Sequence, residues 1–121
     1  MKKERRYRRS RKIRLTSSIA FREVRARGRS KSGKLFRLSV CEGLETEPTA
    51  VGFVVPKKLG SAPERNRLRR RLREIHRLSQ HKILGGKWVV VLAYPEAVRA
   101  TYWELEKEWL RLGKCLGIFA L

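Results

Sequence analysis

The stretch VGFVVPKKLGSAPERNRLRRRLRE, residues 51–74, decides the fold of this chain. It opens within an apolar run, residues 50–55, that is typical of a β-strand and that Pro56 stops. A helix is expected after Ser61, because the Ser61 side chain can cap the helix start while Glu64 reaches back to the Ser61 backbone. The stretch therefore predicts a strand, a turn and a helix in immediate succession.

The helix after Ser61 combines an apolar stripe with six arginines. Leu68, Leu72 and Ile75 are spaced i, i+4, i+7, so one narrow face is expected to pack on the core. The rest of the surface must then hold Arg65, Arg67, Arg69, Arg70, Arg71 and Arg73. Like charges four residues apart destabilise a helix by about 0.2–0.5 kcal/mol per pair, and a bound polyphosphate would reverse that sign. Because guanidinium groups bind phosphate through two hydrogen bonds and stack on bases, the pattern predicts a nucleic-acid-binding helix.

Two further features of this segment allow more than one interpretation. Asn66, the only asparagine in the chain, could read a base edge or a 2′-hydroxyl, or it could satisfy a helix end. Lys57 and Lys58 lie where the strand gives way to the turn, and backbone donors at the following helix start would add to their charge. Together these groups predict an anion site, but a lysine pair is also common on any protein surface.

Upstream of this stretch, the pattern predicts a helix, a loop and a strand. Phe21 lies on a short predicted helix, with capping residues at 16–18 and Gly28 at its C-terminal end. Residues 30–34 are expected to form a loop. Residues 35–41 alternate between apolar and polar side chains, which predicts a half-buried strand.

Downstream, Gly85 and Gly86 break the chain before an apolar run, residues 88–94, that is typical of a strand buried on both faces. A last helix is expected from about Thr101. Its apolar side is formed by Tyr102, Leu105, Trp109 and Leu112. The predicted order is helix, strand, strand, helix, strand, helix, which corresponds to a small α/β (α+β) sandwich.

The net charge of the 121-residue chain is +20, beyond what solubility alone requires. Residues 1–40 carry a net +14 and residues 57–82 a net +8, whereas residues 41–56 are net −3 and residues 83–121 are net +1. An ordinary solvated surface is the alternative explanation, but charge of this size and unevenness favours a polyanionic partner.

The remaining composition indicates the domain organisation of the protein and its location in the cell. Residues 1–13, almost free of apolar side chains, are expected to form a flexible basic arm before a single domain at residues 14–121. No run approaches the roughly 20 apolar residues of a membrane span, and the N-terminus lacks the apolar stretch of a secretory signal. Cys41 and Cys115 are isolated, so two reduced thiols are expected rather than a zinc site or a disulfide. We therefore expect a cytoplasmic protein with no membrane partner.

The sequence offers little for autonomous hydrolysis of RNA. It contains no aspartate, whereas two-metal phosphodiester cleavage requires clustered carboxylates. Glu104 and Glu108 share a helix face and are interpreted as solvated positions. His76 and His81, the only histidines, are five residues apart and do not share a helix face as an acid–base pair could. We expect no catalytic residue and no bound metal on this chain.

The segment from Gly52 to Glu74 resembles the signature of the bacterial ribonuclease P protein family. Its elements are a strand ending in Lys-Lys, a Gly-x-Ala turn at residues 60–62, and a helix that begins Arg-Asn-Arg and continues Leu-Arg-Arg-Arg-Leu-Arg-Glu. The resemblance extends over everything past the basic arm. It implies a ribosomal-S5-like α/β fold in the order α-β-β-α-β-α, with room for a third strand before the second helix. It also implies a left-handed β-α-β crossover around the Arg-Asn-Arg helix, an exception to the common handedness.

The same resemblance implies which residues contact RNA. Those expected to face the catalytic RNA are Arg65, Asn66, Arg67, Arg69, Arg70 and Arg73. Those expected to bind the single-stranded 5′ leader of precursor tRNA, in a cleft between the first helix and the sheet, are Arg14, Phe21, Arg25, Phe36, Val55, Lys57, Lys58 and Ala93. Phe21 could also be an ordinary core residue. The family often has aromatic residues where this chain has Arg25 and Ser39, so charge could replace stacking in the cleft.

The resemblance thus implies the protein subunit of a ribonucleoprotein whose RNA holds Mg²⁺ and removes the 5′ leader from precursor tRNA. The protein itself would not be catalytic. Other departures, Pro56 for Ser, Ser61 for Asn and Tyr94 for Arg, concern details of the cleft. A ribosomal or other RNA-packaging protein would share fold and charge, and the Lys-Lys to Arg-Asn-Arg signature distinguishes it. DNA is not expected as a partner, because no segment is spaced as a helix-turn-helix.

Overall fold

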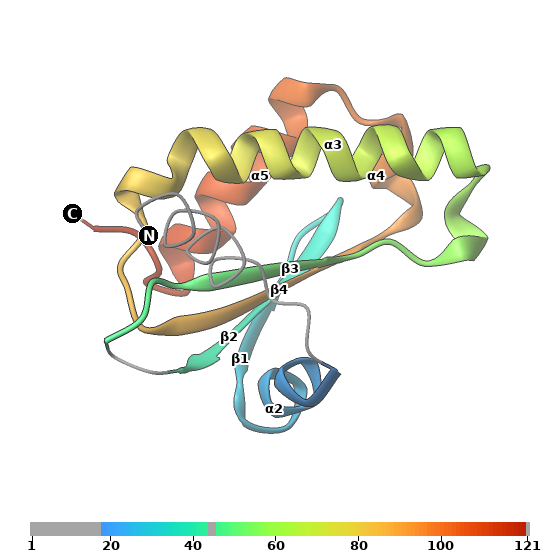
Figure 1. Cartoon of the computed structure of the whole chain (residues 1–121). Coiled ribbons are helices and arrows are strands. Elements are labelled where there is room, and N and C mark those ends of the chain that lie inside the picture. The colour runs from blue at the N-terminus through green and yellow to red at the C-terminus, as the bar shows by residue number, and fades with distance from the viewer. Residues whose placement is uncertain (1–17, 44–45, 121) are drawn as a thin grey trace, which may run out of the picture.

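The computed structural model describes residues 18–43 and 46–120 (Figure 1). The elements in chain order are α2 (Ser18–Arg27), β1 (Arg29–Ser32), β2 (Phe36–Glu42), β3 (Ala50–Val54), the 3-10 turn η1 (Lys57–Leu59), α3 (Ala62–Ser79), the 3-10 turn η2 (Gln80–Lys82), β4 (Lys87–Ala93), α4 (Pro95–Arg99) and α5 (Tyr102–Cys115). The predicted basic arm, residues 1–13, and the predicted site residue Arg14 lie outside the described residues.

The four strands form one sheet in the order β1-β2-β4-β3. Strands β1 and β2 make an antiparallel hairpin, and β2 is also antiparallel to β4. Strands β3 and β4 are parallel neighbours, and α3 forms the crossover that joins them. Figure 1 shows α3, α4 and α5 on one side of the sheet and α2 on the other. This arrangement is the mixed α and β fold that the sequence predicts, with the additional strand that the family resemblance allows.

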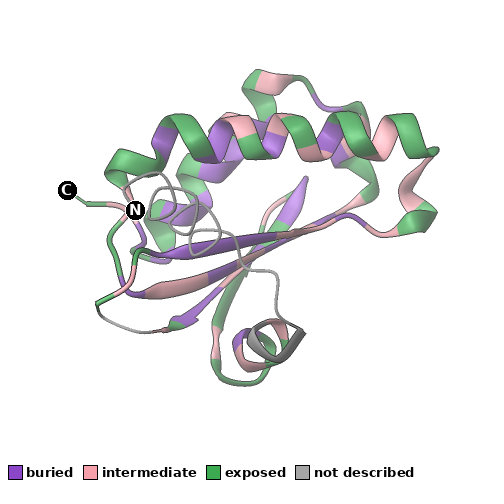
Figure 2. Ribbon diagram, in the orientation of Figure 1, coloured by how far each residue is buried: buried purple, intermediate pink, exposed green. Residues whose placement is uncertain are grey.

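The main core fills the space between the sheet and the pair α3 and α5. The predicted stripe of α3 is confirmed, because Leu68, Leu72 and Ile75 are all buried there. The sheet contributes the alternate residues of β2 and β4, and α5 contributes Trp109 with its apolar neighbours. In Figure 2 the buried residues follow the helix and sheet surfaces that face each other, and the outer surface of α3 is largely exposed or intermediate.

A second, smaller core lies under α2 on the opposite face of the sheet. Val24, Cys41 and Ala50 are buried in it, and Phe21 and Trp88 pack against it. Among the described residues, α2 packs on β2 and β4 and leaves part of that face open as a cleft. Strand β4 therefore alternates between buried and intermediate residues, and the prediction that it is buried on both faces is wrong.

The structure corrects two further expectations about secondary structure. Most of residues 30–34, predicted to be a loop, belongs to β1, which pairs with β2 as an exposed edge strand. All four β1 residues are exposed, so no apolar alternation marks this strand in the sequence. The short helix α4 was not predicted either. The predicted starts of the second and third helices are confirmed, since Ser61 with Glu64, and Thr101 with Glu104, form complete capping boxes. The capping residues predicted for the first helix lie largely outside the described residues.

The prediction that Glu104 and Glu108 are solvated positions is wrong for Glu108, which is only 8% exposed. The Leu35 N–H donates to Glu108 Oε2 at 3.0 Å, and Arg111 donates to Oε1 at 2.8 Å. Burial opposes ionisation of this carboxyl, but the hydrogen bonds from Leu35 and Arg111 outweigh it and lower its pKa. A Cβ at Gly33 would lie 1.9 Å from Oε2, so the hairpin turn closes directly around the carboxylate. Glu108 thus fastens the β1–β2 hairpin to α5.

His76 is a second buried group that can ionise, at 7% exposure. Its ring makes edge contacts with Phe53 and Trp109, each at 6.2 Å between centroids. Its Nε2 has no hydrogen-bond partner among the described residues. Burial lowers the pKa of His76 to about 4, because the charged imidazolium would lose its hydration.

The buried His76 predicts a loss of stability in mild acid. The unfolded chain takes up a proton on this side chain below about pH 6.5, whereas the folded protein resists uptake until about pH 4. The free energy of unfolding should therefore fall by about 2 kcal/mol from this group between pH 7.5 and pH 5. Urea unfolding at the two pH values measures the loss. It should disappear in His76→Leu and persist in His81→Gln, which changes an exposed histidine; equal losses in wild type and His76→Leu would contradict the prediction.

Candidate nucleic-acid interface

The arginines of α3 divide into two groups. Arg65, Arg69 and Arg71 are half-buried, and they donate to the backbone carbonyls of Gly60, Val55 and Ala100 respectively. Arg67, Arg70 and Arg73 are exposed and, within residues 18–43 and 46–120, form no ion pair or side-chain hydrogen bond. The first group holds α3 to the turn before it and to α4, and the second group is free to bind phosphate.

Asn66 was predicted either to read RNA or to satisfy a helix end, and the structure shows it in contact with a neighbouring arginine. It is exposed, and its Oδ1 accepts a hydrogen bond from Arg69 at 3.1 Å. The amide thus positions an arginine and leaves its own NH₂ group facing solvent. A shallow groove of about 370 Å³ runs beside it along α3. Its lining residues are Asn66, Arg69, Arg70, Arg73, Glu74 and Arg77. Glu74 pairs with Arg77 at 2.7 Å, so the net charge of this groove remains strongly positive.

The predicted anion site at Lys57 and Lys58 is only partly present. Both lysines are exposed on η1, between β3 and α3. The start of α3, however, already holds the Glu64 carboxylate, which accepts the Ser61 N–H at 2.8 Å. That hydrogen bond lowers the pKa of Glu64. An incoming anion would thus meet the two ammonium groups without that backbone donor.

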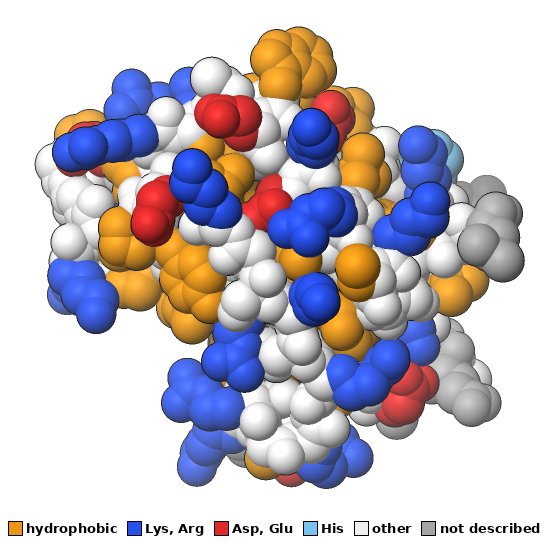
Figure 3. Space-filling model, turned by 180° about the vertical axis from the view of Figure 1, so that it is seen from behind, with side chains coloured by type: hydrophobic (Ala, Val, Ile, Leu, Met, Phe, Trp, Pro, Cys, Tyr) orange, Lys and Arg blue, Asp and Glu red, His pale blue; other side chains and the backbone are white. Residues whose placement is uncertain are grey.

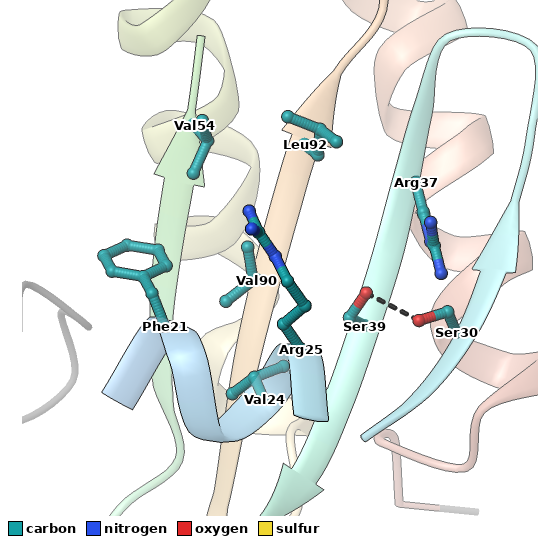
Figure 4. Close-up of a pocket in the computed structure, with 9 residues that line it drawn as sticks. All are labelled: Phe21, Val24, Arg25, Ser30, Arg37, Ser39, Val54, Val90 and Leu92. Atoms are coloured by element: carbon teal, nitrogen blue, oxygen red, sulfur yellow. Dashed lines mark hydrogen bonds between the residues drawn. The ribbon is translucent and has the colours of Figure 1, made fainter. Parts of the chain in front are cut away.

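On the opposite side of the sheet, α2 leaves an open cleft of about 460 Å³. The strand register explains its floor, because Val54, Leu92 and Arg37 stand side by side across β3, β4 and β2. The next row toward α2 holds Val90 and Ser39. Figure 4 shows Phe21 and Arg25 reaching over this floor from α2. The full lining is Phe21, Val24, Arg25, Ser30, Arg37, Ser39, Val54, Val90 and Leu92.

Two of the residues predicted for leader binding, Phe21 and Arg25, line this cleft. Phe36, Val55 and Ala93 do not, because they are buried in the main core on the other face, at 0%, 5% and 3% exposure. Their placement in the cleft is therefore wrong. The physical reason is that side chains of a strand alternate between the two faces of a sheet. Each of the three residues is the sequence neighbour of one that lines the cleft, namely Arg37, Val54 or Leu92.

The cleft residues missed by sequence reasoning are Val24, Ser30, Arg37, Val54, Val90 and Leu92. Alternation along β2 and β4 was a usable signal, because it places Arg37 opposite to buried Phe36 and Leu38. Ser30 Oγ and Ser39 Oγ form a hydrogen bond of 2.8 Å across β1 and β2. Farther along the same rim, Ser32 Oγ bonds the Tyr94 hydroxyl at 2.9 Å.

The charge of the surface around α5 is mixed. Figure 3, which views the molecule from behind, shows acidic side chains among basic ones over its upper part, where α5 lies. In residues 18–43 and 46–120, no three His, Cys, Asp or Glu side chains gather where they could hold a metal ion. No helix in the same residues is long and apolar enough to cross a membrane.

The fold and these two surfaces define a small, strongly basic α+β protein that presents free arginines on one helix and two more over an open sheet cleft. The sequence matches the ribonuclease P family over residues 10–117. It is 39% identical over 105 residues to the ribonuclease P protein component of Symbiobacterium thermophilum, covering 87% of this chain and 91% of that protein. The corresponding protein of Acidothermus cellulolyticus is 40% identical over 103 residues, which cover 84% and 85% of the two chains.

Solved structures agree with the sequence matches. The RNase P protein of Staphylococcus aureus superposes with a TM-score of 0.82 at 26% identity, covering 89% of this chain and 98% of that chain. The RNase P protein of Thermotoga maritima superposes with a TM-score of 0.73 at 27% identity, covering 82% and 93%. The chain belongs to the ribonuclease P protein family.

Proposed function

We propose that this chain is the protein subunit of a bacterial ribonuclease P and that it binds two RNA segments at once. The exposed arginines of α3 bind the catalytic RNA, and the cleft under α2 binds the single-stranded 5′ leader of precursor tRNA. The protein provides no catalytic group. The RNA holds the Mg²⁺ ions and hydrolyses the phosphodiester, which leaves a 5′-phosphate on the mature tRNA.

The observation that carries this proposal is the placement of two cationic surfaces on opposite sides of one sheet. Arg67, Arg70 and Arg73 lie on the helix side, and Arg25 and Arg37 lie on the α2 side. Lys57 and Lys58 stand between the two surfaces, because they follow closely after Val54 at one end of the cleft and precede α3. A protein with this shape can hold a leader strand next to a folded RNA and lower the repulsion between them.

Cleavage of precursor tRNA at low Mg²⁺ tests the proposal directly. Three reactions are compared: bacterial ribonuclease P RNA alone, the protein alone, and the two together. The proposal requires correct cleavage at the mature 5′ end by the mixture, at a rate well above that of the RNA alone, and a steep loss of binding with salt. Equal rates with and without protein would favour a ribosomal or RNA-packaging role, and cutting by the protein alone would overturn the assignment of chemistry to the RNA.

A further inference from the structure

Trp103 on α5 is the most exposed large apolar side chain in the described part of the chain, at 72%. The buried side of α5 includes Leu105, Trp109 and Leu112. Trp103 precedes Leu105 by two positions, which places it about 200° around the helix. The indole therefore points away from the core, and the packing of α5 does not require it.

The ring of Trp103 is positioned by the residue before it. Tyr102 makes a T-shaped contact with Trp103, with 5.2 Å between the ring centroids and 87° between the ring planes. Such a contact occupies at most one face of the indole, so the other face stays open to solvent. An open aromatic face held in place by a neighbouring ring is suited to stacking on an unpaired nucleobase.

The aromatic pair lies next to the arginine face of α3. Helices α3 and α5 pack side by side (Figure 1). Arg71 of α3 donates to the Ala100 carbonyl at 3.0 Å, just before α5 begins. Tyr102 is close enough to Glu74 and Arg77 for their charges to act on its hydroxyl. Because Glu74 and Arg77 also line the groove along α3, the aromatic pair continues that surface onto α5.

The charges beside the indole do not favour binding of phosphate there. Glu104 and Glu106 flank Trp103 on α5, against Lys107 alone. A nucleobase is uncharged and needs only the aromatic face. The phosphates of the same RNA segment would instead be bound by the exposed arginines of α3.

We infer that an unpaired base of the catalytic RNA stacks on Trp103 while neighbouring phosphates bind the arginines of α3. This inference rests on the proposed function and extends the α3 interface onto α5. The catalytic RNA supplies the base, rather than the 5′ leader, because the leader cleft lies on the opposite side of the sheet. Stacking adds affinity that depends little on salt, since it neutralises no phosphate and releases no counterion.

The test measures binding of bacterial ribonuclease P RNA to the full-length protein, without precursor tRNA. Trp103→Ala should weaken binding about 10-fold, as expected for the loss of one stacked base. Trp103→Leu keeps an apolar side chain without a ring and should lose as much. Trp103→Phe keeps an aromatic face and should lose less than about 3-fold. Urea unfolding checks that each variant is folded.

Two further measurements make the test specific. The slope of log affinity against log salt should be the same for Trp103→Ala and wild type, because no phosphate contact is lost. The matched control is Leu110→Ala, which removes an exposed apolar side chain about two turns along α5 and should leave RNA affinity unchanged. A photoreactive p-benzoylphenylalanine in place of Trp103 should crosslink to the RNA, and the same group in place of Leu110 should do so far less.

The outcomes separate this inference from the proposed function. If Trp103→Ala binds RNA like wild type while joint replacement of Arg67, Arg70 and Arg73 weakens binding, the stack is overturned and the subunit assignment stands. The exposed indole would then serve a protein partner. Wild-type affinity in Trp103→Leu, or a lowered salt slope in Trp103→Ala, also overturns the stack. If neither the Trp103 variants nor the arginine variant affects RNA binding, the proposed α3 interface fails, and the inference with it.

Discussion

Replacing Arg67, Arg70 and Arg73 together with glutamine is expected to weaken binding of ribonuclease P RNA about 100-fold near 0.15 M salt, because counterion release contributes about 1 kcal/mol for each phosphate neutralised. The three side chains are exposed and form no ion pair or side-chain hydrogen bond among the described residues, so the fold should not depend on them. Filter binding or calorimetry over a range of salt concentrations measures the effect. The slope of log affinity against log salt should fall by about 2–3.

The control for this variant removes equal charge from elsewhere. Lys82, Lys107 and Lys114 are exposed on η2 and α5 and do not line the groove beside α3. Their joint replacement with glutamine should cost much less affinity if binding is local to α3. A loss equal to that of the arginine variant would show that only the overall charge of +20 matters, and the α3 interface would have to be abandoned.

Replacing Phe36 with alanine is expected to lower the free energy of unfolding by about 3–5 kcal/mol, the usual cost of deleting a fully buried aromatic side chain. Phe36 is 0% exposed and packs in the main core, on the face of the sheet away from the cleft. The leader contribution to precursor affinity, measured on folded enzyme, should not change. Chemical denaturation of the free protein gives the first quantity, and the precursor-to-mature affinity ratio gives the second.

Two variants complete the Phe36 test. Phe36→Leu keeps most of the volume and should cost no more than about 1.5 kcal/mol, so that a folded sample is available. Leu105→Ala, in the same core at 0% exposure, should destabilise without any effect on the leader. If Phe36→Leu instead lowered the leader contribution and left the unfolding free energy unchanged, Phe36 would have to contact RNA and the packing described above would be wrong.

The sheet gives the two proposed RNA-binding surfaces different surroundings. Its two faces are used differently: one is closed by α3 and α5, and the other is only partly covered by α2. The closed face fixes α3 so that Arg67, Arg70 and Arg73 project outward. The partly covered face leaves aliphatic surface next to Arg25 and Arg37. Glu108 of α5 accepts a hydrogen bond from Leu35 in the β1–β2 hairpin, which carries Arg37. A helix on the closed face of the sheet therefore helps to position an arginine of the cleft.

Local signals in the sequence were sufficient for much of this description. The capping box at Ser61 depends on residues three apart, and the stripe Leu68, Leu72, Ile75 depends on helical spacing alone. The separation of charge into two blocks and the Arg-Asn-Arg signature are likewise contained in the chain. These features predicted the α3 helix, its buried face, its arginine surface and the family.

Features that depend on contacts between distant segments were decided only by the tertiary structure. Strand β1 has no apolar pattern of its own, and its pairing with β2 makes it a strand. The buried Glu108 carboxylate is stabilised by a hydrogen bond from Leu35, 73 residues away. The cleft depends on which of two alternating sets of side chains faces α2, and a shift of one residue exchanges Phe36 for Arg37. The sequence by itself thus determined the helix that carries the arginines, whereas the composition of the cleft was decided by strand register and by the packing of α2 on β2 and β4, because both depend on contacts between segments that are far apart in the chain.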